Sequence, residues 1–164
     1  ECCLVIPEGI IGECLSLFEM SLLYAKEHKN QIFLWRLHPL LSFSKLKKIS
    51  PNFNKLPINI HLSNDTLDND ILKCNSVLYR GSTAVVNAIS AGLKPIYYQQ
   101  SVDEISIDPI YQCNKGKYIV NNLIELGVAF HEDLDKVSRQ SLQDFAQDFY
   151  TPLNIEVLLK EFVT

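Results

Sequence analysis

Four consecutive residues, Arg80, Gly81, Ser82 and Thr83, carry groups that bind phosphate in many proteins. An arginine fork pairs with phosphate oxygens, a glycine lets the backbone approach a ligand, and hydroxyls and free amides at a helix start donate to anions. A simpler interpretation stays open, in which Ser82 only caps a helix and Gly81 only makes a turn. The spacing fits neither a Walker loop nor a Gly-x-Gly-x-x-Gly fingerprint, so it indicates neither an ATPase nor a dinucleotide enzyme.

Two further polar segments, Pro7-Glu8-Gly9 and His38-Pro39, also follow apolar runs. His38 can donate to a phosphate or to a leaving-group oxygen, and its ordinary pKa lets it work charged or neutral. It can equally be a strand-end histidine bonded to a nearby carbonyl. Glu8 can bind a sugar hydroxyl or act as a base, although a carboxylate before a helix is also favourable for the helix dipole alone.

The segments between these residues alternate between apolar runs and helical repeats, which predicts an α/β fold. The predicted strands are 2–6, 31–37, 58–63, a run ending at Tyr79, and 94–99; the predicted helices are 13–28, 42–49, 66–74 with Thr66 as cap, the segment after Thr83, and 132–150. We expect a Rossmann-like parallel sheet with helices on both faces. The carboxyl ends of parallel strands open onto one crevice, so the three polar segments should converge there.

The region after residue 99 is harder to interpret. Its segment 117–126 fits a strand or a helix, and we favour a helix from about Val120 followed by a short strand at Val128–Phe130. Pro109 to Cys113 fits one helical turn. Thr151-Pro152 should end the helix over 132–150 before a final helix.

Composition and length indicate one globular domain over residues 1–164, because 47% of the residues are hydrophobic and 21% are charged. The chain starts at Glu1 directly in a strand, which predicts a piece of a longer protein. The net charge of -4 and pI near 5.5 argue against a nucleic-acid partner. No apolar run is long enough for a transmembrane segment.

The five cysteines form no Cys-x-x-Cys pair and are odd in number, so they indicate neither a disulfide framework nor a zinc ribbon. No histidine pair has metal-site spacing either, and we expect no metal. This cysteine usage predicts a cytoplasmic location. Peripheral association with the inner face of the membrane stays open.

The segments "LWRLHP" and "YRGSTAVVNAISAGLKPIYY" together resemble the carboxyl-terminal donor-binding domain of bacterial GT-B-type glycosyltransferases of surface polysaccharide synthesis. The His-Pro and Ser/Thr pairs are similar to the nucleotide-binding motifs of sialyl- and polysialyltransferases. The resemblance implies that His38 meets the donor phosphate, with Arg36 and Pro39 nearby. It implies that Ser82 and Thr83 bind phosphate through hydroxyl and amide groups.

The chain also departs from that family in two places. Asn87 stands where many sugar-nucleotide transferases have a glutamate that holds the ribose, and Pro7-Glu8-Gly9 only partly matches the acidic motif that carries the sialyltransferase base. The predicted donor-binding set is therefore Arg36, His38, Pro39, Arg80, Gly81, Ser82, Thr83 and Asn87. The catalytic base is expected in an absent amino-terminal domain, with Glu8 as the local candidate.

The resemblance implies a domain that binds a CMP- or UDP-linked nucleotide-sugar as substrate and needs no further cofactor. The whole enzyme would transfer the sugar to a surface polysaccharide or glycolipid acceptor, which an amino-terminal domain would bind; the fragment alone should be inactive. Two other interpretations stay open. One is a sugar-nucleotide epimerase of the same architecture, and the other is a Rossmann-like module without catalytic activity.

Overall fold

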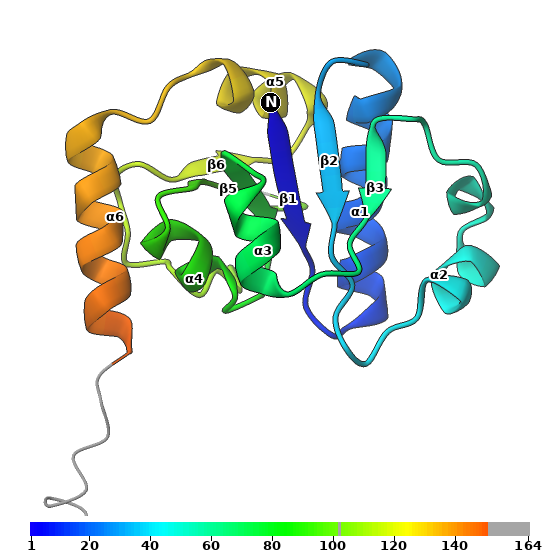
Figure 1. The fold of residues 1–164 in the computed structure, drawn as a ribbon, viewed down its shortest axis with the longest axis horizontal. Helices are drawn as coiled ribbons and strands as arrows, with labels where there is room; N and C mark the ends of the chain where they lie inside the picture. The colour runs from blue at the N-terminus through cyan, green and yellow to red at the C-terminus, as the bar shows by residue number, and fades with distance from the viewer. Residues whose placement is uncertain (102, 151–164) are drawn as a thin grey trace, which may run out of the picture.

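A six-stranded parallel sheet forms the centre of the computed structural model, which describes residues 1–101 and 103–150 (Figure 1). Its strands lie in the order β3-β2-β1-β4-β5-β6 and every neighbouring pair is parallel. The strands are β1 (Cys2–Ile6), β2 (Ile32–Trp35), β3 (Ile60–Leu62), β4 (Ser76–Tyr79), β5 (Lys94–Tyr98) and β6 (Tyr118–Val120). The predicted Rossmann-like fold is confirmed.

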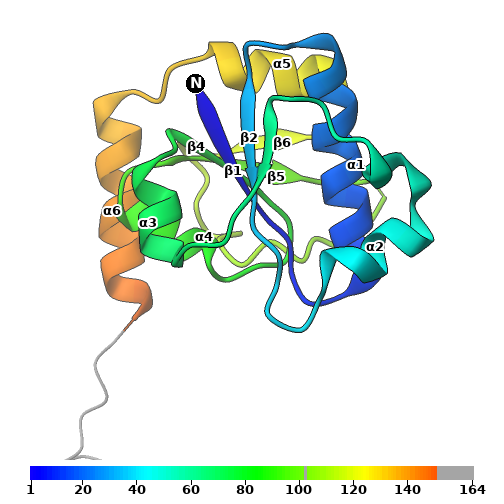
Figure 2. The same ribbon diagram turned by 45° about the vertical axis from the view of Figure 1, so that its right-hand side comes forward.

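Alternate side chains of the strands supply two hydrophobic cores, one on each face of the sheet. Cys3 and Val5 of β1 belong to the first core, whereas Leu4 and Ile6 belong to the second. The first core is covered by α1 (Ile11–Glu27), α2 (Phe43–Ile49) and α5 (Leu123–His131); the second by α3 (Leu67–Leu72), α4 (Val85–Ser90) and α6 (Lys136–Phe149) (Figure 2). The expected helices on both faces are thus present, and a 3₁₀ turn, Pro51–Asn54, follows α2.

Side-chain caps fix several helix starts. The Thr66 hydroxyl accepts a hydrogen bond from the Asn69 amide at 3.3 Å, which confirms the predicted cap of α3. Asn122 accepts from the Glu125 amide at 2.9 Å and starts α5 in the same way. Each cap satisfies an amide that has no partner inside the helix.

The predicted strand Val128–Phe130 is wrong, because these residues lie in α5. Leu126, Ala129 and Phe130 are buried at helical spacing and pack into the first core. The helix predicted from about Val120 starts later, and β6 precedes it. The predicted break at Thr151-Pro152 and the final helix lie outside the described residues.

No helix within residues 1–101 and 103–150 combines the length and apolar character that crossing a membrane requires.

Candidate functional site

The strand order reverses between β1 and β4, and the loops after these two strands meet at the carboxyl edge of the sheet. In open parallel sheets, ligands bind at this position. A β-carbon placed on Gly81 would lie 2.7 Å from Oε2 and 2.8 Å from Cδ of Glu8. The Glu8 carboxyl group therefore packs directly on the Gly81 backbone, and a side chain at position 81 would displace it.

The loop after β2 joins the same place through His38. A β-carbon on Gly9 would lie 3.0 Å from both Cε1 and Nδ1 of the His38 ring. The Leu40 amide donates to Nδ1 at 3.3 Å, so the neutral ring carries its proton on Nε2. Among the described residues, neither ring nitrogen of His38 bonds to a carbonyl, and its Nε2–H makes no hydrogen bond. The three polar segments converge as expected.

Ser82 and Thr83 come between β4 and α4, and their side chains do not cap the helix. The N-cap of α4 is Ala84, and no side chain bonds there. The carbonyl oxygens of Ser82 and Thr83 accept from Val85 and Val86 at 3.2 and 3.0 Å. Neither hydroxyl and neither backbone amide of the pair is a donor to any group in residues 1–101 and 103–150. Both residues therefore keep donors available for a ligand.

One carboxyl oxygen of Glu8 has no hydrogen-bond donor among the described residues. Its Oε1 atom is buried and has no hydrogen-bond partner among the described residues. Burial raises the pKa of Glu8, and the nearby negative charge of Glu13 raises it further, while Arg80 and His38 act in the opposite direction. A buried carboxyl oxygen without a donor is stabilised by a hydrogen bond from a hydroxyl group, or by protonation of the carboxyl group itself.

Arg80 is buried, and its guanidinium is already bonded to the protein. It forms ion pairs with Glu13 of α1 and with Glu104 of the loop after β5, and it donates to the Tyr98 carbonyl at 3.1 Å. Burial opposes its charge, but the bonds to Glu104 and Glu13 outweigh this and raise the pKa of Arg80. Arg80 thus positions the loops around the site, and the predicted fork toward phosphate is occupied in this structure.

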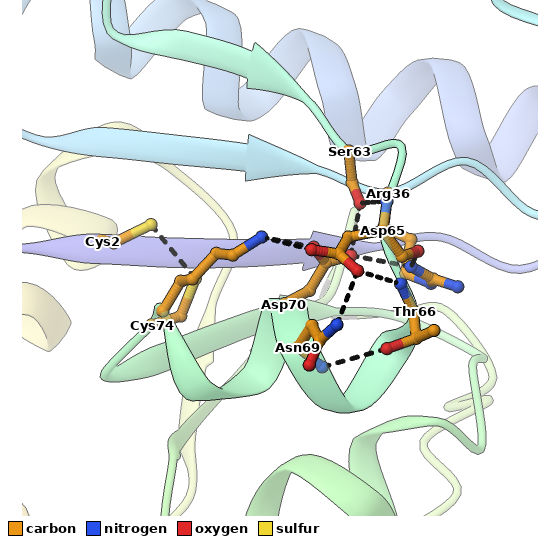
Figure 3. A network of polar contacts seen from close by, with 9 residues as sticks. Cys2, Arg36, Ser63, Asp65, Thr66, Asn69, Asp70 and Cys74 are labelled. Carbon is orange, nitrogen blue, oxygen red and sulfur yellow. Dashed lines mark hydrogen bonds and ion pairs between the residues drawn. The ribbon is translucent and has the colours of Figure 1, made fainter.

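Arg36 is held in a second ion pair, with the fully buried Asp70 of α3 (Figure 3). Its Nη1 donates to Asp70 Oδ2 and to the Asp65 carbonyl, both at 2.7 Å. The Ser63 hydroxyl donates to the same Asp70 oxygen at 2.5 Å. Arg36 lies two positions before His38, so this network anchors the loop that carries the histidine to the start of α3.

The other predicted donor-binding residues lie at the edge of this arrangement or away from it. Pro39 is exposed in the turn after His38. Asn87 is exposed on α4, where its amide oxygen accepts from the Tyr150 hydroxyl at 3.2 Å. It lines a hollow between α3 and α4 with Asp68 and Ser90, and the structure does not bring it to Glu8.

Sequence reasoning missed the ion pairs that Glu13, Glu104 and Asp108 form near the site. Asp108 is buried, accepts from the Tyr79 hydroxyl at 2.9 Å and pairs with Lys117 at 2.5 Å, so it fixes the loop after β5. Glu104 and Asp108 are thus ion-pair partners of Arg80 and Lys117 within the domain. Glu104 is 24 positions from Arg80 and Asp108 is 29 positions from Tyr79 in sequence, and no local pattern signals such pairs.

Around Gly81, the site offers the hydroxyls and amides of Ser82 and Thr83 and the Nε2–H of His38 as donors. The Glu8 carboxyl group is the acceptor. Such a set can bind a phosphate and a neighbouring hydroxyl. Within the part of the chain that the structure describes, no three His, Cys, Asp or Glu side chains gather as metal ligands would.

No protein-family model and no curated protein sequence matches the chain. Solved structures of glycosyltransferases share its fold. They include the glycotransferase of kitacinnamycin (TM-score 0.62, 11% identity), the catalytic domain of cholesterol-alpha-glucosyltransferase from Helicobacter pylori (0.59, 14%) and the glycosyltransferase SnogD from Streptomyces nogalater (0.60, 8%).

These matches cover 90%, 90% and 99% of this chain respectively. The chain spans only 39% of the kitacinnamycin protein and 44% of SnogD, but 97% of the Helicobacter pylori catalytic domain. At these identities the likeness establishes a shared α/β fold.

Proposed function

We propose that this chain is the donor-binding domain of a GT-B-type glycosyltransferase, which transfers a sugar from a CMP- or UDP-linked nucleotide-sugar to a surface polysaccharide or glycolipid. One observation carries the proposal: the buried Glu8 Oε1, which has no hydrogen-bond partner among the described residues, lies at the switch point of the sheet next to Gly81, which directly precedes Ser82 and Thr83. A hydroxyl-rich anion would donate a hydrogen bond to Glu8 and accept hydrogen bonds from Ser82 and Thr83.

In the proposed complex, the donor phosphate lies against Ser82 and Thr83. Their amides and hydroxyls donate to its oxygens, and the His38 Nε2–H supplies a further donor, which becomes stronger when the ring is protonated. Charge that develops on the departing phosphate is stabilised by these fixed donors, with no reorganisation of solvent. Glu8 Oε1 accepts from a hydroxyl of the donor.

The acceptor and the catalytic base belong, in this proposal, to another part of the protein. The fold likeness supports this, since the chain matches less than half of two of the glycosyltransferase structures. The isolated domain should bind nucleotide without transferring sugar.

A titration of the domain with CMP, CDP, UDP and GDP, followed by ligand-observed NMR, tests the proposal. Loss of one hydrogen bond to a charged group is worth roughly 1.5–3 kcal/mol, so His38→Ala and Ser82→Ala should each weaken binding about tenfold or more. His61→Ala on β3 and Ser90→Ala at the far end of α4 change exposed residues of the same types and should leave affinity unchanged. A flat response to all four nucleotides, or equal losses in the control variants, contradicts the proposal.

A further inference from the structure

Two cysteines that are 72 positions apart in sequence meet at the amino-terminal edge of the sheet, opposite the candidate site. The Sγ atoms of Cys2 and Cys74 are 3.1 Å apart (Figure 3). Cys2 begins β1, and Cys74 lies in the turn between α3 and β4. The Asn75 amide donates to the Cys2 carbonyl at 3.0 Å, and Cys3 pairs with Ser76 in the parallel ladder. The backbone therefore holds both thiols in place.

The two thiols differ in acidity in the way that a reactive pair requires. The hydrogen bond with Cys74 lowers the pKa of Cys2 against the opposing effect of burial, and the positive charges of the amino terminus at Glu1 and of Lys73 lower it further. The same hydrogen bond, together with burial, raises the pKa of Cys74. Asp70 opposes ionisation of both. Cys2 is thus the more acidic of the two thiols, and Cys74 is the less acidic one.

The remaining cysteines are unsuited to this chemistry. Cys3, Cys14 and Cys113 are buried, whereas Cys2 and Cys74 are partly exposed to solvent. Burial raises the pKa of Cys3 and of Cys14 to about 12. Burial also raises the pKa of Cys113, and thiols whose pKa is raised in this way are mostly protonated and react slowly.

We propose that Cys2 and Cys74 form a redox site that a peroxide oxidises to an intramolecular disulfide. The Cys2 thiolate attacks one peroxide oxygen, the O–O bond breaks, and the departing hydroxide takes up a proton, which leaves a sulfenic acid on Cys2. Cys74 gives up its proton and attacks that sulfur; the S–S bond forms and water leaves. In total, two thiols and one hydrogen peroxide give one disulfide and two waters.

The disulfide would join the central strand β1 to the end of α3. Helix α3 carries Asp70, which holds Arg36 and through it the loop of His38. The cross-link would therefore restrain α3, which holds the His38 loop in place, without any contact with the candidate site. The inference does not depend on the proposed function, since it needs only the positions of the two thiols.

The test is peptide mapping of the folded 164-residue chain after mild treatment with hydrogen peroxide and alkylation of the remaining thiols. Trypsin cleaves after Lys26, Lys73 and Arg80, so Cys74 is released on residues 74–80 and Cys2 on residues 1–26. We expect these two peptides to be linked in protein that migrates as a monomer, two of the five thiols to be lost, and dithiothreitol to restore both.

Cys2→Ser and Cys74→Ser should each abolish the link, whereas Cys3→Ala, one position from Cys2 but buried, should retain it. Circular dichroism establishes that each variant is folded. If one variant is not, fragmentation of the linked wild-type peptide, whose residues 1–26 also include Cys3 and Cys14, locates the bond at Cys2. Folded wild-type protein that keeps five free thiols overturns the proposal. So does oxidation of Cys2 beyond the sulfenic acid without a link, a link that persists in Cys2→Ser, or a link between two chains.

Discussion

The carboxyl group of Glu8 packs on the backbone of Gly81, so close that a β-carbon on Gly81 would lie 2.7 Å from Oε2. These residues belong to the loops after β1 and β4, the two strands between which the strand order reverses. The contact therefore joins the two loops at which we propose that the nucleotide binds.

Gly81→Ala should push the Glu8 carboxyl group out of position. The contacting atoms are the end of a flexible side chain, so we expect a loss of less than about 1 kcal/mol in unfolding free energy but a nucleotide affinity at least roughly tenfold weaker. Gly92→Ala is the contrasting variant, because Gly92 has φ +88°. Alanine there should lower the unfolding free energy by about 1–2 kcal/mol through backbone strain, with little change in nucleotide affinity. Urea unfolding and nucleotide titration measure both; wild-type affinity in Gly81→Ala would contradict the site.

Arg80→Met should destabilise the domain by about 2 kcal/mol, because it leaves Glu13 and Glu104 without their common partner. The carboxylates are partly exposed and regain water, which keeps the cost below that of a fully buried pair. A double-mutant cycle with Glu104→Gln, read by urea unfolding, isolates the pair. Strictly additive effects would show that the pair contributes nothing to stability.

Asp70→Asn should cost about 2–3 kcal/mol in unfolding free energy, somewhat less than the roughly 3–5 typical of breaking a buried ion pair, since Arg36 is partly exposed. It should also weaken nucleotide binding, because the loop of His38 loses its anchor. Asp68→Asn changes an exposed carboxylate on the same helix and should stay within about 0.5 kcal/mol of wild type. Equal stability of the two variants would exclude the anchoring role of Asp70.

Glu8→Gln should stabilise the domain at pH 7 and have little effect near pH 4. Burial and the charge of Glu13 raise the pKa of Glu8 above its ordinary value of 4.5, so the folded state disfavours the ionised form. Its contribution to stability is fully present below about pH 4.5 and is lost as the pH rises through the raised pKa. Urea midpoints at the two pH values measure this, with Asp103→Asn as the control for removing one exposed charge. If Glu8→Gln stabilises the domain more at pH 4 than at pH 7, the pKa of Glu8 is not raised in the folded state, and the prediction is refuted.

The sequence predicted the sheet because apolar runs such as 2–6 and 94–98 stand out between amphipathic helices. It failed at α5, where Val128 is β-branched and Phe130 is aromatic, so that this segment imitates a strand. The sequence did contain a signal for the helix, an N-cap at Asn122 followed three positions later by the carboxylate of Glu125. The Oε2 atom of Glu125 accepts from the Asn121 amide at 2.8 Å.

The convergence of Glu8, His38 and Gly81 followed from strand ends in a parallel sheet, and this part of the site was predictable. The partners of Arg80 were not, because Glu13 lies 67 positions away and only the packing of α1 against the sheet brings it close. The meeting of Cys2 and Cys74 was equally invisible, since it depends on β1 and β4 becoming neighbours.

The central place of β1 has a consequence for synthesis of the chain. Val5 and Leu78 are opposite each other in the ladder, so β1 keeps one edge open until the ribosome has released more than seventy further residues. Pairing over such separations is slow, and an open apolar edge invites pairing with other chains. Nascent chains that stop before β4 should therefore depend more strongly on chaperones than chains that include both β4 and its outer neighbour β5.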